Sequence, residues 1–192
     1  MNYKKTISKD EINNLPAYIF NGRIEIIDHQ DDVSKAIEEL QKHKVLGFDT
    51  ETRAAFKKGE RYDVSLLQLA TDSTAYLFRL NRLSNFEQLF SLLSDPNIVK
   101  AGVAVRDDII ALQKLLSFEA QNFVDLAVIA KENKIEKFGL RALVAILLGK
   151  RLSKKAKISN WDREKLTDAQ IHYAACDGVV GYEIYCKFFE GA

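Results

Sequence analysis

The sequence predicts one α/β domain in which a mixed β-sheet carries helices on both of its faces. Three strand-like segments follow one another between residues 44 and 80, and helical and extended segments alternate after them. With 192 residues, 47% of them hydrophobic, the chain is long enough to bury one sizeable core. We expect the polar residues 1–18 to form an N-terminal arm and residues 19–192 to form the domain.

Runs of apolar residues predict the strands. In chain order, these segments cover residues 44–52, 63–71, 74–80 and 97–105. Residues 19–27 predict a further pair of strands, because Asn21-Gly22 favours a tight hairpin turn. Residues 123–133 begin as an extended segment and are expected to turn helical.

Apolar residues at helical spacing predict the helices. They cover residues 31–43, 85–95, 107–116, 140–149 and 167–189. The first helix begins with two aspartates, which favour a helix start, and it places Val33, Ile37 and Leu40 on one face. Pro96 cannot continue the helix before it and therefore closes that helix.

The charge balance limits how this chain could hold a polyanion. Its formal net charge is +1 and its pI about 7.7, below the basic balance of proteins that hold nucleic acid by charge alone. A local basic patch or metal ions would be needed. The N-terminus resembles no signal peptide, and no apolar run reaches the length of a membrane span. Cys176 and Cys186 lie about 15 Å apart on one helix, too far for a disulfide. We expect a cytoplasmic setting and no membrane partner.

The segment VLGFDTET (45–52) ends a buried strand on two carboxylates. Asp49 and Glu51 are two residues apart and point to one face, whereas Leu46 and Phe48 point to the opposite face, into the core. Neighbouring carboxylates repel one another unless a cation lies between them, and Mg²⁺ prefers clustered carboxylate oxygens. A metal site and a solvated acidic pair at the sheet edge are equally compatible with this segment alone.

Two later segments supply further acids. Asp107 and Asp108 follow a strand at a helix start, a pattern that by itself favours helix capping, with Asp107 as the N-cap. Tyr173 and Asp177 are four residues apart and share one helix face. Small neighbours let another element approach this helix, as in an ordinary packing seam: Ala174, Ala175 and Gly178. Brought together by the fold, the four acids could surround two metal ions about 3.5–4 Å apart, as in phosphoryl-transfer sites.

These motifs resemble those of the DEDD-type 3′→5′ exonucleases. FDTET matches the first motif, GVAVRDDIIAL the second and YAACD the third, in the subgroup with a tyrosine in its third motif, which includes ribonuclease D and Werner-type exonuclease domains. The resemblance extends over roughly residues 20–190. It implies a ribonuclease H-like fold and hydrolysis from the 3′ end of DNA or RNA, DNA slightly favoured, with release of nucleoside 5′-monophosphates.

The resemblance also implies a role for each site residue. Asp49, Glu51 and Asp177 would bind one divalent ion, Mg²⁺ or Mn²⁺, which activates water. Asp49 would bridge to a second ion, which Asp108 helps to hold, and Tyr173 would orient the attacking water or the scissile phosphate. Gly178 departs from the family pattern, which more often has alanine there.

Basic and aromatic residues near the motifs are candidate contacts to a single-stranded or 3′-recessed nucleic acid. The candidates are Thr50, Phe56, Lys57, Lys58, Arg61, Lys154 and Lys155. A solvated loop is the alternative reading of the first basic run and a solvated helix end that of the second. Phe56 could stack on a base or anchor its loop in the core. We expect Trp161 to pack under the last helix, His172 to lie on the surface and Asp125 to cap the helix after it.

Two other functions are compatible with parts of the pattern. A non-cleaving nucleic-acid-binding module on an exonuclease fold would not need all four acids and the tyrosine. A phosphohydrolase with an aspartyl nucleophile usually has a second aspartate two residues further on, where this chain has Glu51.

Overall fold

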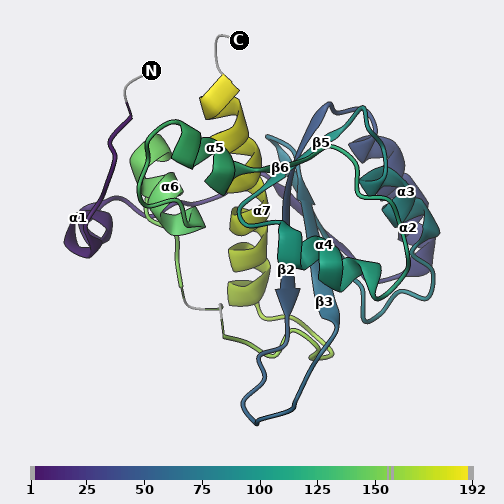
Figure 1. Cartoon of the computed structure of the whole chain (residues 1–192). Helices are drawn as coiled ribbons and strands as arrows, with labels where there is room; N and C mark the ends of the chain where they lie inside the picture. The colour runs from purple at the N-terminus through teal and green to yellow at the C-terminus, as the bar shows by residue number, and fades with distance from the viewer. Residues whose placement is uncertain (1–2, 155, 157, 190–192) are drawn as a thin grey trace.

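The computed structural model describes residues 3–154, 156 and 158–189. At its centre is a six-stranded sheet with the order β1-β4-β3-β2-β5-β6 (Figure 1). The strands are β1 (Arg23–Ile27), β2 (Val45–Thr52), β3 (Val64–Ala70), β4 (Thr74–Arg79), β5 (Val99–Gly102) and β6 (Phe123–Asp125). β2, β3 and β4 pair antiparallel, whereas β1, β5 and β6 join the sheet in parallel. The predicted mixed sheet is therefore confirmed.

The predicted hairpin at Asn21-Gly22 is wrong. Only the residues after the turn form a strand, β1, which pairs in parallel with β4 at the edge of the sheet. Phe20 packs instead against a buried cluster of small side chains from β3, β4 and α7 (Asp168–Phe189). A Cβ on Gly22 would lie 2.3 Å from the Phe20 ring and 2.4 Å from the carbonyl oxygen of Ser73. Burial of the Phe20 ring thus overrides the local turn preference.

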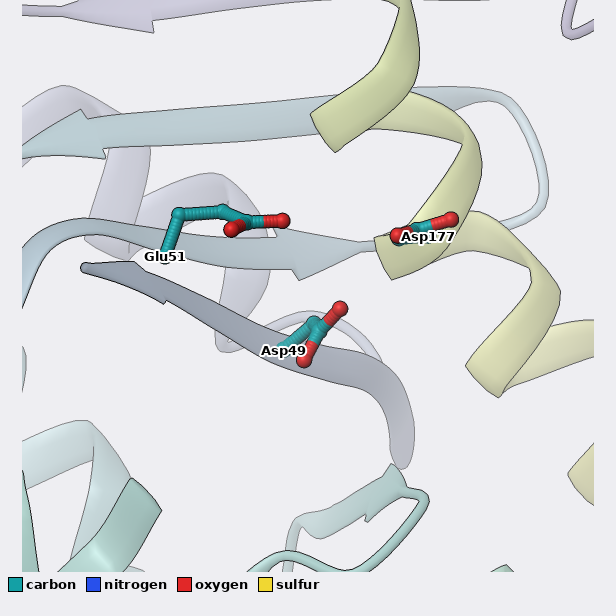
Figure 2. A group of neighbouring side chains, drawn as sticks. All are labelled: Asp49, Glu51 and Asp177. Carbon is teal, nitrogen blue, oxygen red and sulfur yellow. The ribbon is translucent and has the colours of Figure 1, made fainter. Parts of the chain in front are cut away.

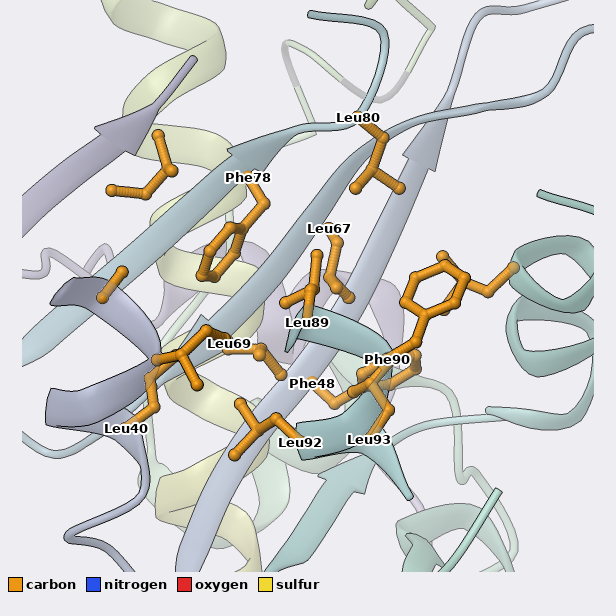
Figure 3. Close-up of a cluster of buried hydrophobic side chains, with 14 of the residues drawn as sticks. Leu40, Phe48, Leu67, Leu69, Phe78, Leu80, Leu89, Phe90, Leu92 and Leu93 are labelled. Atoms are coloured by element: carbon orange, nitrogen blue, oxygen red, sulfur yellow. The ribbon is translucent and has the colours of Figure 1, made fainter. Parts of the chain in front are cut away.

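Helices cover both faces of the sheet, as predicted. The others are α1 (Lys9–Asn14), α2 (Gln30–Leu40), α3 (Glu87–Leu93), α4 (Arg106–Gln113), α5 (Leu126–Glu132) and α6 (Leu140–Leu148). On one face, Phe48, Leu67 and Phe78 of the sheet belong to one core with Leu40 of α2 and Phe90 of α3 (Figure 3). On the other face, α7 lies on the sheet and packs against α5 and α6. None of the helices among the described residues has the length and apolar character needed to span a bilayer.

α7 lies directly on the backbone of the central strands. A Cβ on Gly47 would lie 2.0 Å from the carbonyl oxygen of Gly178, and one on Gly181 would lie 2.6 Å from that of Ala101. The glycines therefore allow a close approach that any side chain would prevent. This confirms the close approach predicted from the small residues of α7, and it brings Asp177 beside β2.

The described part of the N-terminal arm, residues 3–18, packs on the domain. The Tyr3 ring meets that of Phe188 edge-on with centroids 5.6 Å apart, and Ile7 is buried. Figure 1 shows α1, which lies within the arm, next to α6. The division of the chain at residue 18 stays a prediction.

Candidate active site

Asp49 and Glu51 lie at the end of β2, where this strand extends beyond its pairing with β5. β2 pairs with β5 only as far as Gly47, which is opposite Ala101, but it stays paired with β3 as far as Thr52. Beyond Gly47, one edge of β2 is therefore without a neighbouring strand. Asp49 and Glu51 occupy this stretch and are partly exposed, while Leu46 and Phe48 on the opposite face of β2 are buried as predicted.

Asp177 of α7 completes a group of three carboxylates. One oxygen from each of Asp49, Glu51 and Asp177 lies within 4.8 Å of the other two. Figure 2 shows the three side chains, which come from the strand and from the helix, gathered around a common space. Several carboxylate oxygens at this spacing are a ligand set that suits a hard divalent cation.

Asp49 lies among other carboxylates whose charges act on it. Burial, together with the charges of Asp177 and Asp108, raises the pKa of Asp49 well above its usual range. One hydrogen bond, from the backbone N–H of Thr50 at 3.0 Å, opposes this rise. A cation between the carboxylates would remove the repulsion, so these residues fit a divalent metal ion.

Asp108 reaches the site from α4 and is held by Thr50. The hydroxyl of Thr50, the residue between Asp49 and Glu51 in the sequence, donates a hydrogen bond of 2.5 Å to Oδ1 of Asp108. Burial raises the pKa of Asp108, and this hydrogen bond lowers it. Among the described residues the close carboxylate group has three members and Asp108 is outside it, although its charge acts on Asp49.

The helix cap predicted at Asp107 is wrong. α4 begins one residue earlier, so Asp107 and Asp108 are its second and third residues. The preceding turn contains Ala104 with φ +60°, and the Ala104 N–H donates a 2.9 Å hydrogen bond to Oδ1 of Asp125. The same oxygen accepts from the N–H of Ala127 at 2.9 Å, which confirms Asp125 as the N-cap of α5. Asp125 thereby ties the turn before α4 to the end of β6.

Tyr173 lies one turn before Asp177 on α7 and donates a hydrogen bond to its carboxylate. Burial and the charges of Asp177 and Glu51 raise the pKa of Tyr173 well above its ordinary value. The phenol therefore keeps its proton at neutral pH and is a hydrogen-bond donor, not a base. Trp161 is fully buried with its ring centroid 6.1 Å from that of Tyr173, so its predicted packing is confirmed. His172 is exposed, also as predicted.

Asp49, Glu51, Asp177 and Tyr173 line a cavity of about 500 Å³, and Asp108 is not part of its lining. The first turn of α6 forms another part of the wall, with Arg141, and the segment after α6 adds Ser153 and Lys154. Arg141 was missed in the sequence, where it is a single cation at the start of an apolar helix. Only the packing of α6 against α7 brings it to the cavity. The cavity thus combines carboxylates suited to metal ions with cations suited to phosphate.

The predicted substrate contacts fall into two groups. Thr50 and Lys154 line the cavity. Four others lie in the loop between β2 and β3, and none of them lines the cavity: Phe56, Lys57, Lys58 and Arg61. Phe56 is 81% exposed, so it is not a core anchor for this loop. Lys155 lies outside the described residues.

The sheet, the crossing helix α7 and the convergent acids define a DEDD-type exonuclease domain. The chain belongs to the 3′-5′ exonuclease family, whose model matches residues 24–190.

Curated relatives agree with this assignment. The mouse bifunctional 3′-5′ exonuclease/ATP-dependent helicase WRN is 35% identical over 194 residues, which cover 96% of this chain and 14% of that protein. The human exonuclease mut-7 homolog is 32% identical over 177 residues, which cover 76% of this chain and 20% of that protein. Ribonuclease D of Gluconacetobacter diazotrophicus is 30% identical over 156 residues, with 79% and 39% covered. The chain thus spans well under half the length of each of these relatives.

Solved structures show the same fold. The EXO domain of Nibbler from Aedes aegypti superimposes with a TM-score of 0.81 at 24% identity, with 91% of this chain and 92% of that chain covered. RNase D of Escherichia coli gives a TM-score of 0.79 at 21% identity, with 88% and 44% covered. RNase D of Trypanosoma brucei, solved in complex with RNA U12, gives 0.75 at 21% identity, with 98% and 67% covered. The predicted ribonuclease H-like fold is therefore confirmed.

Proposed function

We propose that this chain is a 3′→5′ exonuclease that requires two divalent metal ions, Mg²⁺ or Mn²⁺, and releases nucleoside 5′-monophosphates from DNA or RNA. The observation that carries the proposal is the approach of Asp49, Glu51 and Asp177 to within 4.8 Å of one another. They line a cavity of about 500 Å³ that also contains Arg141 and Lys154. Membership of the exonuclease family supports the same activity.

We propose a different set of carboxylates for each of the two ions. Asp49, Glu51 and Asp177 would hold the ion on the side of the attacking water. Asp49 would also help to hold a second ion, together with Asp108, which the hydrogen bond from Thr50 fixes. When bound, such ions lower the pKa of water and offset the charge that develops on the phosphate.

We assign the chain to the tyrosine subgroup of the family, and the position of Tyr173 in the third motif supports this assignment. The Tyr173 phenol is held beside Asp177 and stays protonated because burial and neighbouring carboxylates raise its pKa. A protonated hydroxyl at this place would donate a hydrogen bond to the attacking water or to the scissile phosphate. Tyr173 would therefore fix the line of attack and not remove a proton.

The substrate we propose is a single strand or a 3′-recessed end. The resemblance seen in the sequence slightly favours DNA, whereas a structural neighbour is an RNase D solved in complex with RNA. Phe56, 81% exposed, is free to stack on a base, a contact worth about 1–3 kcal/mol. Four lysines and arginines would contact phosphates beside Lys154: Lys57, Lys58, Arg61 and Lys155.

The direct test is a timed digestion of oligonucleotides that carry a label at the 5′ or the 3′ end, as DNA and as RNA. A 3′→5′ exonuclease gives a descending ladder from the 5′-labelled strand and an immediate labelled mononucleotide from the 3′-labelled strand. Binding without cleavage in every metal would favour the non-cleaving module. A phosphorylated Asp49 trapped during turnover would favour the phosphohydrolase.

A further inference from the structure

A second cavity, of about 290 Å³, opens between α1 and the start of α6. Four basic side chains line it: Lys9 of α1, Lys137 before α6, Arg141 in the first turn of α6, and Lys154 after α6. Within the described ranges, the rest of its lining is apolar or amide and includes no carboxylate. We call these four side chains the basic track.

The basic track is continuous with the active site. Arg141 and Lys154 line both cavities, so the second cavity begins where the catalytic one ends. One nearby acid of α1, Glu11, is paired with Lys4 at 2.5 Å and accepts a hydrogen bond from the Ser8 N–H at 2.7 Å. Its charge is therefore balanced locally by Lys4, and the charged side chains that line the second cavity are all positive among the described residues.

The N-terminal arm holds Lys9 in a fixed place relative to α6. Lys137 Nζ donates a 3.0 Å hydrogen bond to the carbonyl oxygen of Ile7, and the N–H of Glu136 donates one of 2.8 Å to that of Lys5. The Ile7 side chain is 5% exposed. Lys9 precedes residues 24–190, the part of the chain that matches the family model.

We infer that the basic track binds the phosphates of the single strand upstream of the scissile bond. With the 3′ end in the catalytic cavity, the strand would leave past Arg141 and Lys154 and continue to Lys137 and Lys9. The direction rests on the proposed function. The net charge of +1 gives little overall attraction for a polyanion, so a local row of cations has to supply it. Contacts to phosphates act through charge and are independent of base sequence.

The experiment compares Lys9→Gln and Lys9→Glu with wild type on a dinucleotide and on a 20-nucleotide single strand. Lys9 is exposed and lies outside the catalytic cavity. We expect Lys9→Gln to raise KM for the long strand about two- to fivefold and Lys9→Glu to raise it further, with kcat and dinucleotide cleavage unchanged. For single strands each lost contact lowers the slope of log affinity against log salt by about 0.7. Lys35→Gln and Lys35→Glu, which change an exposed lysine of α2, are the matched controls for net charge.

Binding of the labelled strand to the same variants in an Asp49→Asn background separates this inference from the proposed function. If wild type cleaves neither substrate, the proposed function fails, and weaker binding by Lys9→Glu than by Lys35→Glu still supports the track. If the Lys9 variants match the Lys35 variants in KM, binding and salt slope, the basic track does not bind the strand. The proposed nuclease activity is unaffected by that result. Equal unfolding temperatures of the variants show that α1 is intact.

Discussion

Gly47 and Gly178 meet backbone to backbone, because a Cβ on Gly47 would lie 2.0 Å from the carbonyl oxygen of Gly178. Asp49 lies two residues after the first glycine and Asp177 one residue before the second. The contact between β2 and α7 therefore sets the distance between these two carboxylates. The geometry of the site therefore depends on the two glycines as well as on the carboxylates, because glycine has no side chain to keep the two backbones apart.

The first prediction concerns this contact. Gly47→Ala would force α7 away from β2, and overpacking of this kind costs about 1–3 kcal/mol. We expect the unfolding temperature to fall by several degrees, at about 2–4 °C for each kcal/mol in a chain of this size, and nuclease activity to be lost. Gly178→Ala is the control: its Cβ would lie 3.1 Å from Gln68 Cβ, which a small shift relieves, and alanine favours the helix. Equal stability of the two variants would show that the crossing is not tight.

The second prediction concerns the stability of the metal-free protein. Because the pKa of Asp49 is raised in the folded state, its ionisation is easier in the unfolded chain, so stability is lost as the pH rises from about 4 through the raised pKa. In EDTA at neutral pH, Asp49→Asn should unfold at a higher temperature than wild type by at least about 2–4 °C, the equivalent of roughly 1 kcal/mol. It should also lose the stabilisation that Mn²⁺ gives wild type. A lower unfolding temperature of the variant in EDTA would contradict the electrostatic account.

The third prediction concerns the hydrogen bond from Thr50 to Asp108. Thr50→Val keeps the shape of the side chain and removes the donor, so Asp108 loses the bond that holds it and lowers its pKa. We expect kcat to fall about tenfold and half-maximal rate to need more metal, since hydrogen bonds to charged groups contribute about 1.5–3 kcal/mol. Thr50→Ser keeps the hydroxyl and should restore most of the rate. A serine variant as slow as the valine variant would assign the loss to packing.

The fourth prediction concerns the protonation of Tyr173. Burial, the main cause of its raised pKa, remains when metal ions bind, so the phenol should stay protonated to beyond its ordinary pKa near 10. The rate should therefore show no loss from tyrosine ionisation between pH 8 and pH 10. Tyr173→Phe should lower kcat about tenfold but keep the stabilisation by Mn²⁺. A midpoint below pH 10 that disappears in Tyr173→Phe would contradict a proton-donating role.

The elements that carry the acids could be predicted from the sequence because their patterns are local. Apolar residues with period two place Asp49 and Glu51 on one face of a strand, and helical spacing places Tyr173 on the same face as Asp177. The small residues of α7 also predict that another element approaches this helix closely, but they do not show that this element is β2 at Gly47. That these segments meet in one cavity was a hypothesis from their joint occurrence and their resemblance to a family.

What could not be predicted depends on tertiary contacts. The Asn21-Gly22 turn has the local chemistry of a hairpin, but burial of the Phe20 ring directs the chain elsewhere. α4 begins earlier than the sequence predicts, after a turn that is held by Asp125 at the end of the neighbouring strand β6. Arg141 gave no signal, since a cation at a helix start is usually solvated, and only the packing of α6 brings it to the cavity.

The central claim is that the three close carboxylates hold divalent metal ions that the nuclease requires. The most direct measurement is the digestion of a 5′-labelled single strand by wild type and by Glu51→Gln in Mg²⁺, Mn²⁺ and EDTA, with Glu38→Gln, a surface acid of α2, as the control. The account predicts a ladder that recedes from the 3′ end with either metal for wild type and the control. It predicts no digestion in EDTA and a rate at least about 100-fold lower for Glu51→Gln in every metal. Digestion in EDTA, or by Glu51→Gln at the wild-type rate, would contradict it.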